Sequence, residues 1–440
     1  MNVERLQRRV VEDPLICLPA VFACCALAGL YIGQTGSLRP LVALGALGGL
    51  TVATARPRFA LALGLAAMAL PYTWGPQNQL FDTGIVVGLL LLIAYAPILT
   101  RFQPGALDLA VLAFAWTQAA IAAFQGQVFH ITAWLAPAIV FPYFGFRLLF
   151  CARDARRVFA TVMILIGVIV SFIGIWEGLT GHNPIVAPGT HTYTSAGHYT
   201  TTWNQPEYRD GHLRALSTFG HPIAFGMFLL IPLAFALARR GPWNLGAAGV
   251  ILIAEALTWS RGPWVGCVVV MVLLAGWNRR RILVAATAIA AAAMFVGPVN
   301  HVLAQSNSAA TEAGESGYYR IGLLSHVFHN VSWFGHPFGD LQSAIPSFAD
   351  VTSLIATTVI QTGILGLVEL AAIACLAITA LVAARRSGDH DYQAATAALT
   401  AQFVGLTTVT LITSYQFFFW VLLAYVATLQ AIHTRERRWP

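Results

Sequence analysis

The sequence predicts an all-α, polytopic integral membrane protein. Hydrophobic residues make up 58% of its 440 positions and charged residues only 10%, whereas a soluble domain carries roughly 25% charged residues. The apolar residues form repeated runs that are long enough to cross the hydrocarbon core of a bilayer as helices. All 25 basic residues are arginine. No basic stripe interleaves with aromatic residues, so nucleic acid is not an expected partner.

Fourteen apolar runs are candidate membrane spans, and several are short enough to pair as hairpins that do not cross completely. We therefore expect 12 to 14 crossings, with 12 preferred, in a single membrane domain that covers residues 1–440. The first run resembles a signal peptide, but further spans follow it, so it is interpreted as a retained helix. The candidate spans are 14–34, 39–55, 57–74, 82–99, 106–125, 129–150, 157–179, 222–238, 244–258, 263–277, 281–298, 363–384, 393–412 and 415–432.

The positions of the arginines orient these spans. If the N-terminus is cytoplasmic, 20 of the 25 arginines fall on the cytoplasmic side, as the positive-inside rule predicts. Both termini are then cytoplasmic, and the two long polar loops, 180–221 and 299–350, lie on the outer side. Ten of the 12 histidines show the opposite bias and fall on that outer side.

Five arginines fall on the outer side against this bias. Arg39 lies at the edge of a span, where snorkelling explains it. Arg209 and Arg214 lie in the 180–221 loop, and Arg320 lies in the 299–350 loop. Because a guanidinium binds phosphate through two parallel hydrogen bonds, outer arginines are candidate ligands for an anionic group.

Arg261 is the fifth outer arginine and the most deeply placed. Its flanking spans, 244–258 and 263–277, have 15 residues each and are about 23 Å long as helices. The hydrocarbon core is about 30 Å thick, so the turn between these spans should lie below the outer surface. Arg261 is expected either to pair with Glu255 or Glu177 or to bind an anion.

The 299–350 loop is polar at first and then amphipathic from Tyr318 to Trp333. Apolar residues recur there at helical spacing, which predicts a helix near the membrane surface with Arg320 in its first turn. Beyond the loop, Gly363 is expected to divide a surface helix from a crossing helix. The apolar positions that define the predicted helix are Ile321, Leu324, Val327 and Phe328.

Two histidines precede prolines, in the sequence Phe-Gly-His-Pro at 219–222 and at 334–337. His221 is expected to set the start of a helix at Pro222. His336 lies in a glycine-flanked turn with room for a ligand, and imidazole, with a reference pKa of about 6.5, suits a general base at neutral pH. The alternative for His336 is an ordinary polar surface position.

Asp389 and Asp391 have the spacing of a pair that holds a divalent ion in many sugar-transferring enzymes. They follow cytoplasmic arginines, however, and lie on the side opposite the outer arginines and histidines. No such acidic pair occurs in the outer loops. If the outer site handles a phosphate leaving group, arginines would have to supply the positive charge there.

Four short motifs, all predicted on the outer side, point to one family. Arg214 precedes Ser217-Thr218-Phe219-Gly220-His221-Pro222, and Ser260-Arg261-Gly262-Pro263-Trp264 forms an outer turn. Arg320 precedes Phe334-Gly335-His336-Pro337-Phe338-Gly339, and Thr362-Gly363-Ile364-Leu365-Gly366 opens the next span. In their order and side, over roughly residues 180–370, these motifs resemble the bacterial O-antigen ligase and polymerase superfamily of lipopolysaccharide assembly.

The resemblance implies a GT-C-like membrane glycosyltransferase with about 12 transmembrane helices and helices in its periplasmic loops. Ligases of this family typically carry Gly-His-Gly in the large loop, with the His held to be catalytic, whereas polymerases commonly carry Gly-x-Gly. This chain has Gly335-His336-Pro337, in which the His favours a ligase. The implied reaction transfers O-antigen polysaccharide from undecaprenyl diphosphate to the lipid A–core oligosaccharide, with inversion and without a metal or other cofactor.

The resemblance also implies roles for the candidate residues. His336 would be the catalytic general base, and Arg214, Arg261 and Arg320 would bind the diphosphate. The expected partners are undecaprenyl-diphosphate-linked O-antigen, the lipid A–core oligosaccharide and membrane lipids. The expected location is the bacterial inner membrane, with a periplasmic active site.

Two alternatives remain open from the sequence. An O-antigen polymerase would use the same donor with a second lipid-linked glycan as acceptor. An ion-coupled transporter would use buried Arg, His, Glu255 and Glu369 as an ion or proton path, although the chain lacks paired broken helices in corresponding halves.

Overall fold

The protein is described here from a computed structural model, and 82% of the described residues are helical. The prediction of a helical protein is confirmed to that extent. The exceptions to the all-α prediction are two short hairpins in the 180–221 loop. The residues that the structure describes are 57–69, 102–128, 131–185, 191–194, 200–203, 207–209, 212–239, 241–275, 319, 321–336, 353–407, 411 and 415–438.

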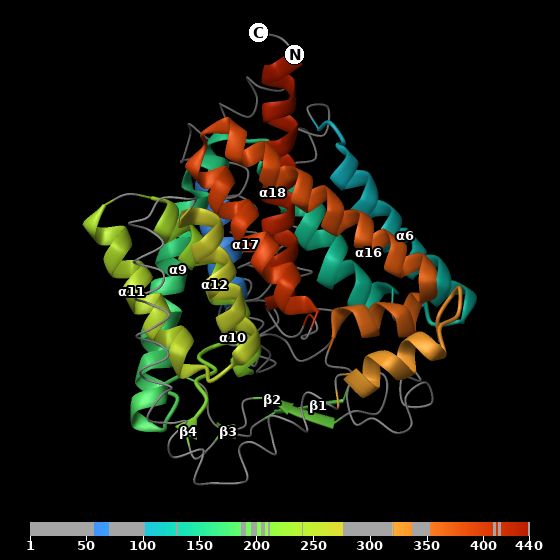
Figure 1. Ribbon diagram of the computed structural model, residues 1–440, viewed down its shortest axis with the longest axis horizontal. Coiled ribbons are helices and arrows are strands. Elements are labelled where there is room, and N and C mark those ends of the chain that lie inside the picture. The colour runs from blue at the N-terminus through green and yellow to red at the C-terminus, as the bar shows by residue number, and fades with distance from the viewer. Residues whose placement is uncertain are drawn as a thin grey trace, which may run out of the picture.

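The elements follow one another along the chain as helices interrupted once by the two hairpins (Figure 1). Strands β1 and β2 pair antiparallel, as do β3 and β4. The elements are α4 (Pro57–Ala69), α6 (Ala106–Phe124), η4 (Ile131–Gly145), α8 (Phe146–Leu149), α9 (Arg153–Thr180), β1 (His191–Thr194), β2 (Thr200–Trp203), β3 (Tyr208–Arg209), β4 (His212–Leu213), α10 (Pro222–Ala238), α11 (Pro242–Leu257), α12 (Arg261–Ala275), α16 (Leu354–Ser387), α17 (His390–Leu406) and α18 (Tyr415–Arg438).

Helices α10 and α18 form the centre of the protein. Helix α10 is apolar on all sides, and a helix of that composition is stable only when other elements surround it. It packs against α9, α11, α12 and α17, while α18 packs against η4, α8, α16 and α17. Phe228 of α10 and Phe418 of α18 join the two, with ring centroids 4.6 Å apart.

Several helix boundaries agree closely with the sequence. The predicted span 222–238 is α10, and the predicted span 106–125 is α6. The predicted span 129–150 is different, because it consists of the π-helix η4 followed by the short helix α8. Pro137 and Pro142 lie within η4 and remove two amide donors from its backbone.

Four helices of the described residues, namely α6, α9, α16 and α18, are long and apolar enough to cross a membrane. Helix α9 has 28 residues and is about 42 Å long, whereas the apolar α11 has 16 residues and is about 24 Å long. These helices support a helical membrane protein. The count of 12 crossings stays a prediction, since spans 14–34, 39–55, 82–99 and 281–298 lie outside the described residues.

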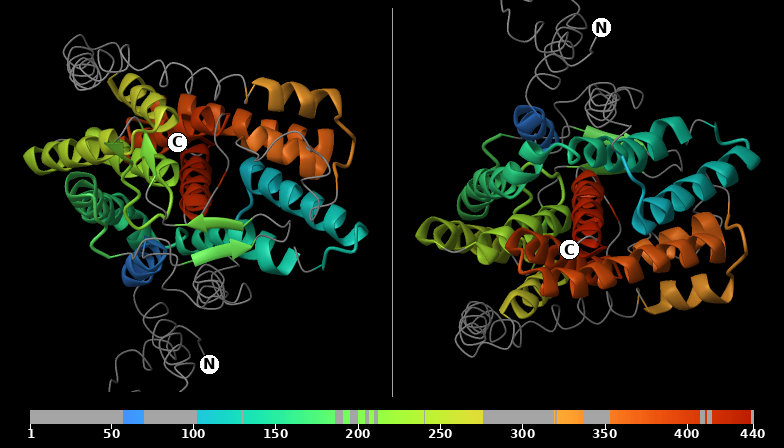
Figure 2. Two further views of the ribbon diagram at one scale, coloured as in Figure 1. Left: turned by 90° about the horizontal axis from the view of Figure 1, so that it is seen from below. Right: turned by 90° about the horizontal axis from the view of Figure 1, so that it is seen from above.

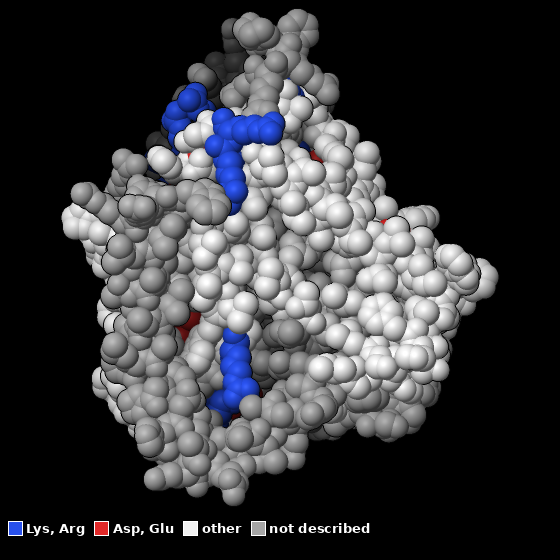
Figure 3. Space-filling model, viewed as in Figure 1, with Lys and Arg blue, Asp and Glu red and all other residues white. Residues whose placement is uncertain are grey.

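The arginines of the described residues lie at opposite ends of the helical body. At one end, Arg239 after α10 donates to both carboxylate oxygens of Asp391 at 2.9 and 2.8 Å, and Tyr425 of α18 donates to the carbonyl of Arg156 at 3.4 Å. The hairpins and the starts of α10, α12 and α16 lie at the other end (Figures 1 and 2). The space-filling view shows arginine at both ends of one face (Figure 3). The alternation of the spans and the compartment that each end faces stay predictions.

The amphipathic helix expected in the 299–350 loop is helical over residues 321–329. It packs on the first section of α16 through Leu323 and Val327, which are buried against Val359 and Ile360. Of the apolar positions that define the predicted helix, Val327 is buried, whereas Ile321 is 68% exposed and Phe328 is 45% exposed. The partner helix selects which side of this helix is buried, and the sequence spacing alone did not identify that partner.

Candidate functional site

The arginine-bearing half of the site is built where the β3–β4 hairpin meets the end of α11. Helix C-termini leave backbone carbonyls without partners, and here the hairpin supplies three donors to consecutive carbonyls. The amide of Ala215 donates to Leu257 O (2.9 Å), Arg214 Nε to Thr258 O (3.3 Å) and Arg209 Nη1 to Trp259 O (2.7 Å). The positive charges also lie where the helix dipole favours them.

Arg214 has further partners at this junction. Its Nη1 donates to a carboxylate oxygen of Glu207 in an ion pair, and its Nη2 donates to Ser260 Oγ at 2.9 Å. The Arg214 amide also donates to the carbonyl of Glu207 at 2.8 Å, so these two residues close the base of the hairpin. Arg214 therefore fixes the turn before α12, which is a positioning role in addition to its predicted role as a phosphate ligand.

His221 is the N-cap of α10, as the sequence predicted. The amide of Ile223 donates to its Nδ1 at 3.1 Å, so Nδ1 is unprotonated and the ring proton lies on Nε2. Nε2 faces Glu207 Oε1 at 3.4 Å. Burial lowers the pKa of the His221 imidazole, while Glu207 raises that pKa and Arg214 lowers it. Both ring nitrogens are thus engaged.

The turn that precedes Arg261 has an unusual backbone. Trp259 has a φ of +49°, which is costly for a residue other than glycine. The hairpin holds this conformation, because His212 stacks on the Trp259 ring with centroids 4.6 Å apart and planes 8° apart. The indole N–H of Trp264 donates to the carbonyl of Glu255 at 3.1 Å and anchors the turn from the other side.

Arg261 is the first residue of α12 and is exposed. No hydrogen bond or ion pair joins its side chain to another described residue, in contrast to Arg209 and Arg214. The expected alternative, an ion pair with Glu177 or Glu255, is absent among the described residues. Glu177 instead accepts the amides of Leu216 and Ser217 at 2.9 and 2.7 Å, and Glu255 is buried between helices.

His336 lies at the end of a loop that enters a break in α16. Gly363 divides that helix as predicted, with φ +66° and ψ −153°. In an unbroken helix the amide of Ile364 would donate to Ile360 O, four residues before it. Instead it donates to Ser332 O at 3.0 Å, and Ile360 O accepts the amide of His336 at 2.6 Å. Ser332 and His336 of the loop therefore replace the partners that Ile364 and Ile360 would have in an unbroken α16.

Two glycines allow this close approach. Gly335 has a φ of +72°, and a Cβ on it would lie 2.4 Å from the carbonyl carbon of Gln361. A Cβ on Gly363 would lie 2.3 Å from Ser332 O. Contacts that short do not occur between a Cβ and backbone, so both positions require glycine in the arrangement observed.

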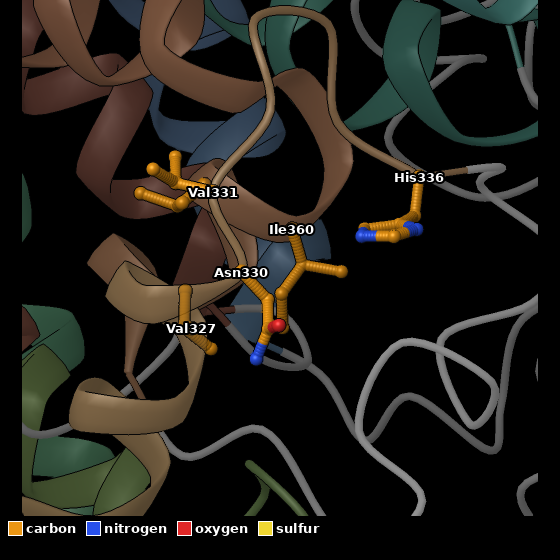
Figure 4. Close-up of a pocket in the computed structure, with 6 residues that line it drawn as sticks. Val327, Asn330, Val331, His336 and Ile360 are labelled. Atoms are coloured by element: carbon orange, nitrogen blue, oxygen red, sulfur yellow. The ribbon is translucent and has the colours of Figure 1, made fainter.

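The imidazole of His336 is half-buried and extends toward the side on which Ile360 and Asn330 lie (Figure 4). No hydrogen bond joins its ring to another described residue. Beside it lies a shallow pocket, with about 220 Å³ of empty space open to solvent. The lining is mostly apolar and comprises Val327, Asn330, Val331, His336, Val359 and Ile360.

The two halves of the candidate site share one end of the protein but lie on different helices. Arg214 and Arg261 are placed by α10, α11 and α12, whereas His336 is placed by α16. Arg320 lies outside the described residues. Its predicted role as a diphosphate ligand stays a prediction.

Glu207, the partner of Arg214 and His221, was not predicted from the sequence. A signal was present, because Asp210-Gly211 between Tyr208-Arg209 and His212-Leu213 is a typical two-residue hairpin turn. The observed pairing of Arg209 with His212 and of Tyr208 with Leu213 places Glu207 opposite Arg214. Reading that register would have paired these two charges from the sequence.

Asp389 and Asp391 have structural partners at the opposite end, as expected from their position. Asp389 is the N-cap of α17 and accepts the amides of Asp391 and Tyr392 at 2.9 and 3.1 Å. Asp391 is paired with Arg239. Within the described residues, no group of three or more His, Cys, Asp and Glu is arranged to hold a metal ion.

Comparison with protein-family models and with curated protein sequences found no match to this chain.

Proposed function

We propose that this chain is an O-antigen ligase of the bacterial inner membrane. It transfers O-antigen polysaccharide from undecaprenyl diphosphate to the lipid A–core oligosaccharide on the periplasmic face, with inversion and without a metal ion. The proposal rests on the sequence motifs around Arg214, Arg261 and His336 and on the positions of these residues in the fold.

One observation carries the proposal furthest. Arg261 and His336 lie at the end of the helical body opposite the arginine-rich end, and the functional groups of both are unengaged by other described residues. A guanidinium without a counter-ion suits an anionic diphosphate, and an imidazole without a hydrogen-bond partner suits proton transfer. The neighbouring Arg214 and His221 are both engaged and so hold the surrounding backbone.

The proposed reaction is a single displacement. His336 takes the proton of the acceptor hydroxyl as the hydroxyl oxygen attacks the anomeric carbon of the donor sugar. The bond from that carbon to the diphosphate oxygen breaks, and undecaprenyl diphosphate leaves with the bonding electrons. Arg261 stabilises the negative charge that develops on the leaving group, with Arg214 and Arg320 as further predicted ligands. One displacement inverts the configuration of the anomeric carbon.

Deletion of the gene, followed by gel analysis of lipopolysaccharide, tests this function. For a ligase we expect complete loss of O-antigen from lipid A–core, restored by the wild-type gene but not by His336→Ala. Capping by single repeats would identify a polymerase instead. Normal lipopolysaccharide in the deletion strain would exclude both enzymes and favour another class, such as a transporter.

Transfer by purified protein with lipid-linked donor and lipid A–core acceptor tests the chemistry directly. We expect transfer to continue in EDTA, because the predicted positive charge at the diphosphate comes from arginine. Activity that disappears in EDTA and returns with magnesium or manganese would contradict the metal-independent mechanism. Asp389→Ala serves as a control, since its carboxylate caps a helix at the opposite end.

The side of the membrane is tested by labelling of His336→Cys in intact cells, in a background without native cysteine. A membrane-impermeant maleimide is expected to label this position from outside. Labelling only after the cytoplasmic face is exposed would reject the proposed periplasmic site.

A further inference from the structure

A second pocket, with a polar lining, lies at the end of the protein where Arg239 pairs with Asp391, opposite the candidate site. It has about 630 Å³ of empty space, part of which is open to solvent. Residues of α8, the start of α9 and the last turns of α18 surround it. The lining residues are Gln103, Arg147, Cys151, Arg156, Thr428, Ala431, Ile432 and Arg435.

Arg147 forms the buried floor of this pocket. It is only 3% exposed and donates to both oxygens of Asp108, from Nε at 2.9 Å and from Nη2 at 3.0 Å. Its Nη1 donates to Thr428 at 3.2 Å, and Tyr143 donates to Asp108 at 2.8 Å. Because its charge is balanced by Asp108, Arg147 supplies a rigid polar floor and little net charge.

The other two arginines have no carboxylate partner among the described residues. Arg156 donates through Nη1 to the carbonyls of Phe150 and Cys151 at 2.6 and 3.1 Å. Arg435 is exposed on the last turns of α18, and no hydrogen bond or ion pair joins it to a described residue. Among the described residues that line the pocket, Arg147, Arg156 and Arg435 are positively charged, and the Asp108 carboxylate balances only Arg147. The lining of the pocket therefore has an excess of positive charge.

We infer that this pocket binds the phosphate group of an anionic phospholipid headgroup. Two arginines with spare donors above a rigid polar floor match the bidentate recognition of phosphate. Basic pockets between membrane helices at the cytoplasmic side are suited to such headgroups, and Ala431 and Ile432 give the pocket an apolar side against which acyl chains can pack. The inference does not depend on the reaction proposed above. A soluble phosphate is the other possible source of the same group.

Binding of short-chain phosphatidylglycerol to the full-length protein in detergent tests the inference, with inorganic phosphate as a second ligand. We expect phosphatidylglycerol to raise the thermal unfolding temperature, and Arg435→Gln to weaken its binding about fivefold, the factor for one arginine near a membrane surface. Arg386→Gln is the matched control, because Arg386 is exposed in the last turn of α16 and outside this pocket.

Cys151 provides a second measurement within the pocket. It lines the pocket and is partly exposed, so alkylation of its thiol reports whether the pocket is occupied. In a variant whose only cysteine is Cys151, bound ligand is expected to slow alkylation, and Arg435→Gln is expected to reduce that protection.

The outcomes distinguish the sources. Protection by phosphatidylglycerol but not by equal inorganic phosphate supports a lipid headgroup, whereas equal protection by both supports a soluble phosphate in the same site. If neither ligand protects Cys151, or if Arg435→Gln binds as tightly as the wild-type protein, the inference is overturned.

Discussion

The sequence Phe-Gly-His occurs at 219–221 and again at 334–336, and the two copies share a backbone feature but differ in their surroundings. Gly220 and Gly335 both lie in the left-handed region, at φ +70° and +72°. Phe219 is fully buried and stacks on Phe228, whereas Phe334 is 65% exposed. The first copy is anchored in the core of the protein, and the second lies at its surface.

The two histidines differ in the same sense. Both ring nitrogens of His221 are engaged, one by the amide of Ile223 and one beside Glu207. The ring of His336 has no such partner among the described residues, and only its backbone is held, by Ile360 O. Identical local sequence thus gives a helix cap in one place and an available imidazole in the other. The hydrogen bonds of the ring, and not the motif, distinguish the two histidines.

Substitution of the two histidines gives the largest expected contrast. His336→Ala should reduce transfer by roughly 100- to 10,000-fold, the usual effect of losing a general base, while donor binding stays near wild type. That deficit should shrink as pH rises, because a more basic medium partly replaces the imidazole. Transfer rates across pH, measured beside binding of a diphosphate-lipid analogue, check this result.

His221→Ala is the matched control for that experiment. It removes a helix cap and should lower the free energy of unfolding by about 1 kcal/mol with a much smaller effect on turnover. If His336→Ala abolishes donor binding, or if His221→Ala reduces turnover as strongly, the assignment of the two roles is wrong.

The glycine that precedes His336 gives the next largest effect. Gly335→Ala should destabilise the loop by more than about 2 kcal/mol, because it adds a backbone clash to the left-handed penalty of roughly 1–2 kcal/mol. Gly181 has a similar φ of +73° but open space around it, so Gly181→Ala should cost only the backbone penalty. Equal unfolding temperatures for the two variants would show that the contact of the loop with α16 does not restrain this loop.

Arg214 and Arg261 extend the same contrast between an engaged and an unengaged group. Arg261→Lys keeps the charge but loses the planar fork, and we expect roughly tenfold weaker donor binding and slower turnover, in line with the loss of one charged hydrogen bond. Arg214→Lys should mainly lower stability, since Arg214 bridges Glu207, Ser260 and Thr258. Titration with a diphosphate-lipid analogue and thermal unfolding separate the two effects, and unchanged donor binding by Arg261→Lys would exclude it as a ligand.

The pH dependence of stability should show the smallest effect. Burial keeps the pKa of His221 in the folded protein below the ordinary value of 6.5, so the unfolded chain binds the proton more readily. The stabilising contribution is therefore complete above about pH 6.5 and is lost as the pH falls toward the folded-state pKa. His221→Asn keeps a capping side chain without this titration. Thermal unfolding between about pH 5 and pH 8 should show a weaker acid destabilisation in the variant, and identical curves would contradict the assignment.

Sequence reasoning succeeded where a local signal determines the structure. His221-Pro222 predicted the start of α10, and Gly363 predicted the division of α16, because proline and glycine restrict or extend the backbone by themselves. The sequence did not predict which side of the 321–329 helix packs against the rest of the protein. That choice depends on packing against α16, which is a long-range contact that helical spacing does not encode.

The candidate site was also only partly predictable. Arg214, Arg261 and His336 were identified by their position against the charge bias and by their motifs, and the structure places all three at one end of the protein. Their different states of engagement depend on the register of the β3–β4 hairpin and on the break in α16. Both are tertiary arrangements. Only the hairpin could have been predicted from the sequence, because Asp210-Gly211 is typical of a hairpin turn.

The hydrogen bonds between the loop and α16 have a consequence for protein engineering. Since Ser332 and His336 exchange hydrogen bonds with Ile364 and Ile360, the loop and the helix break form one unit across a long stretch of sequence. A chimera that imports the 299–350 loop from another protein would need to import residues 353–366 as well. If the loop were transplanted alone, its hydrogen bonds to Ile360 and Ile364 would no longer fit. Recombination libraries should therefore place their crossover points beyond α16.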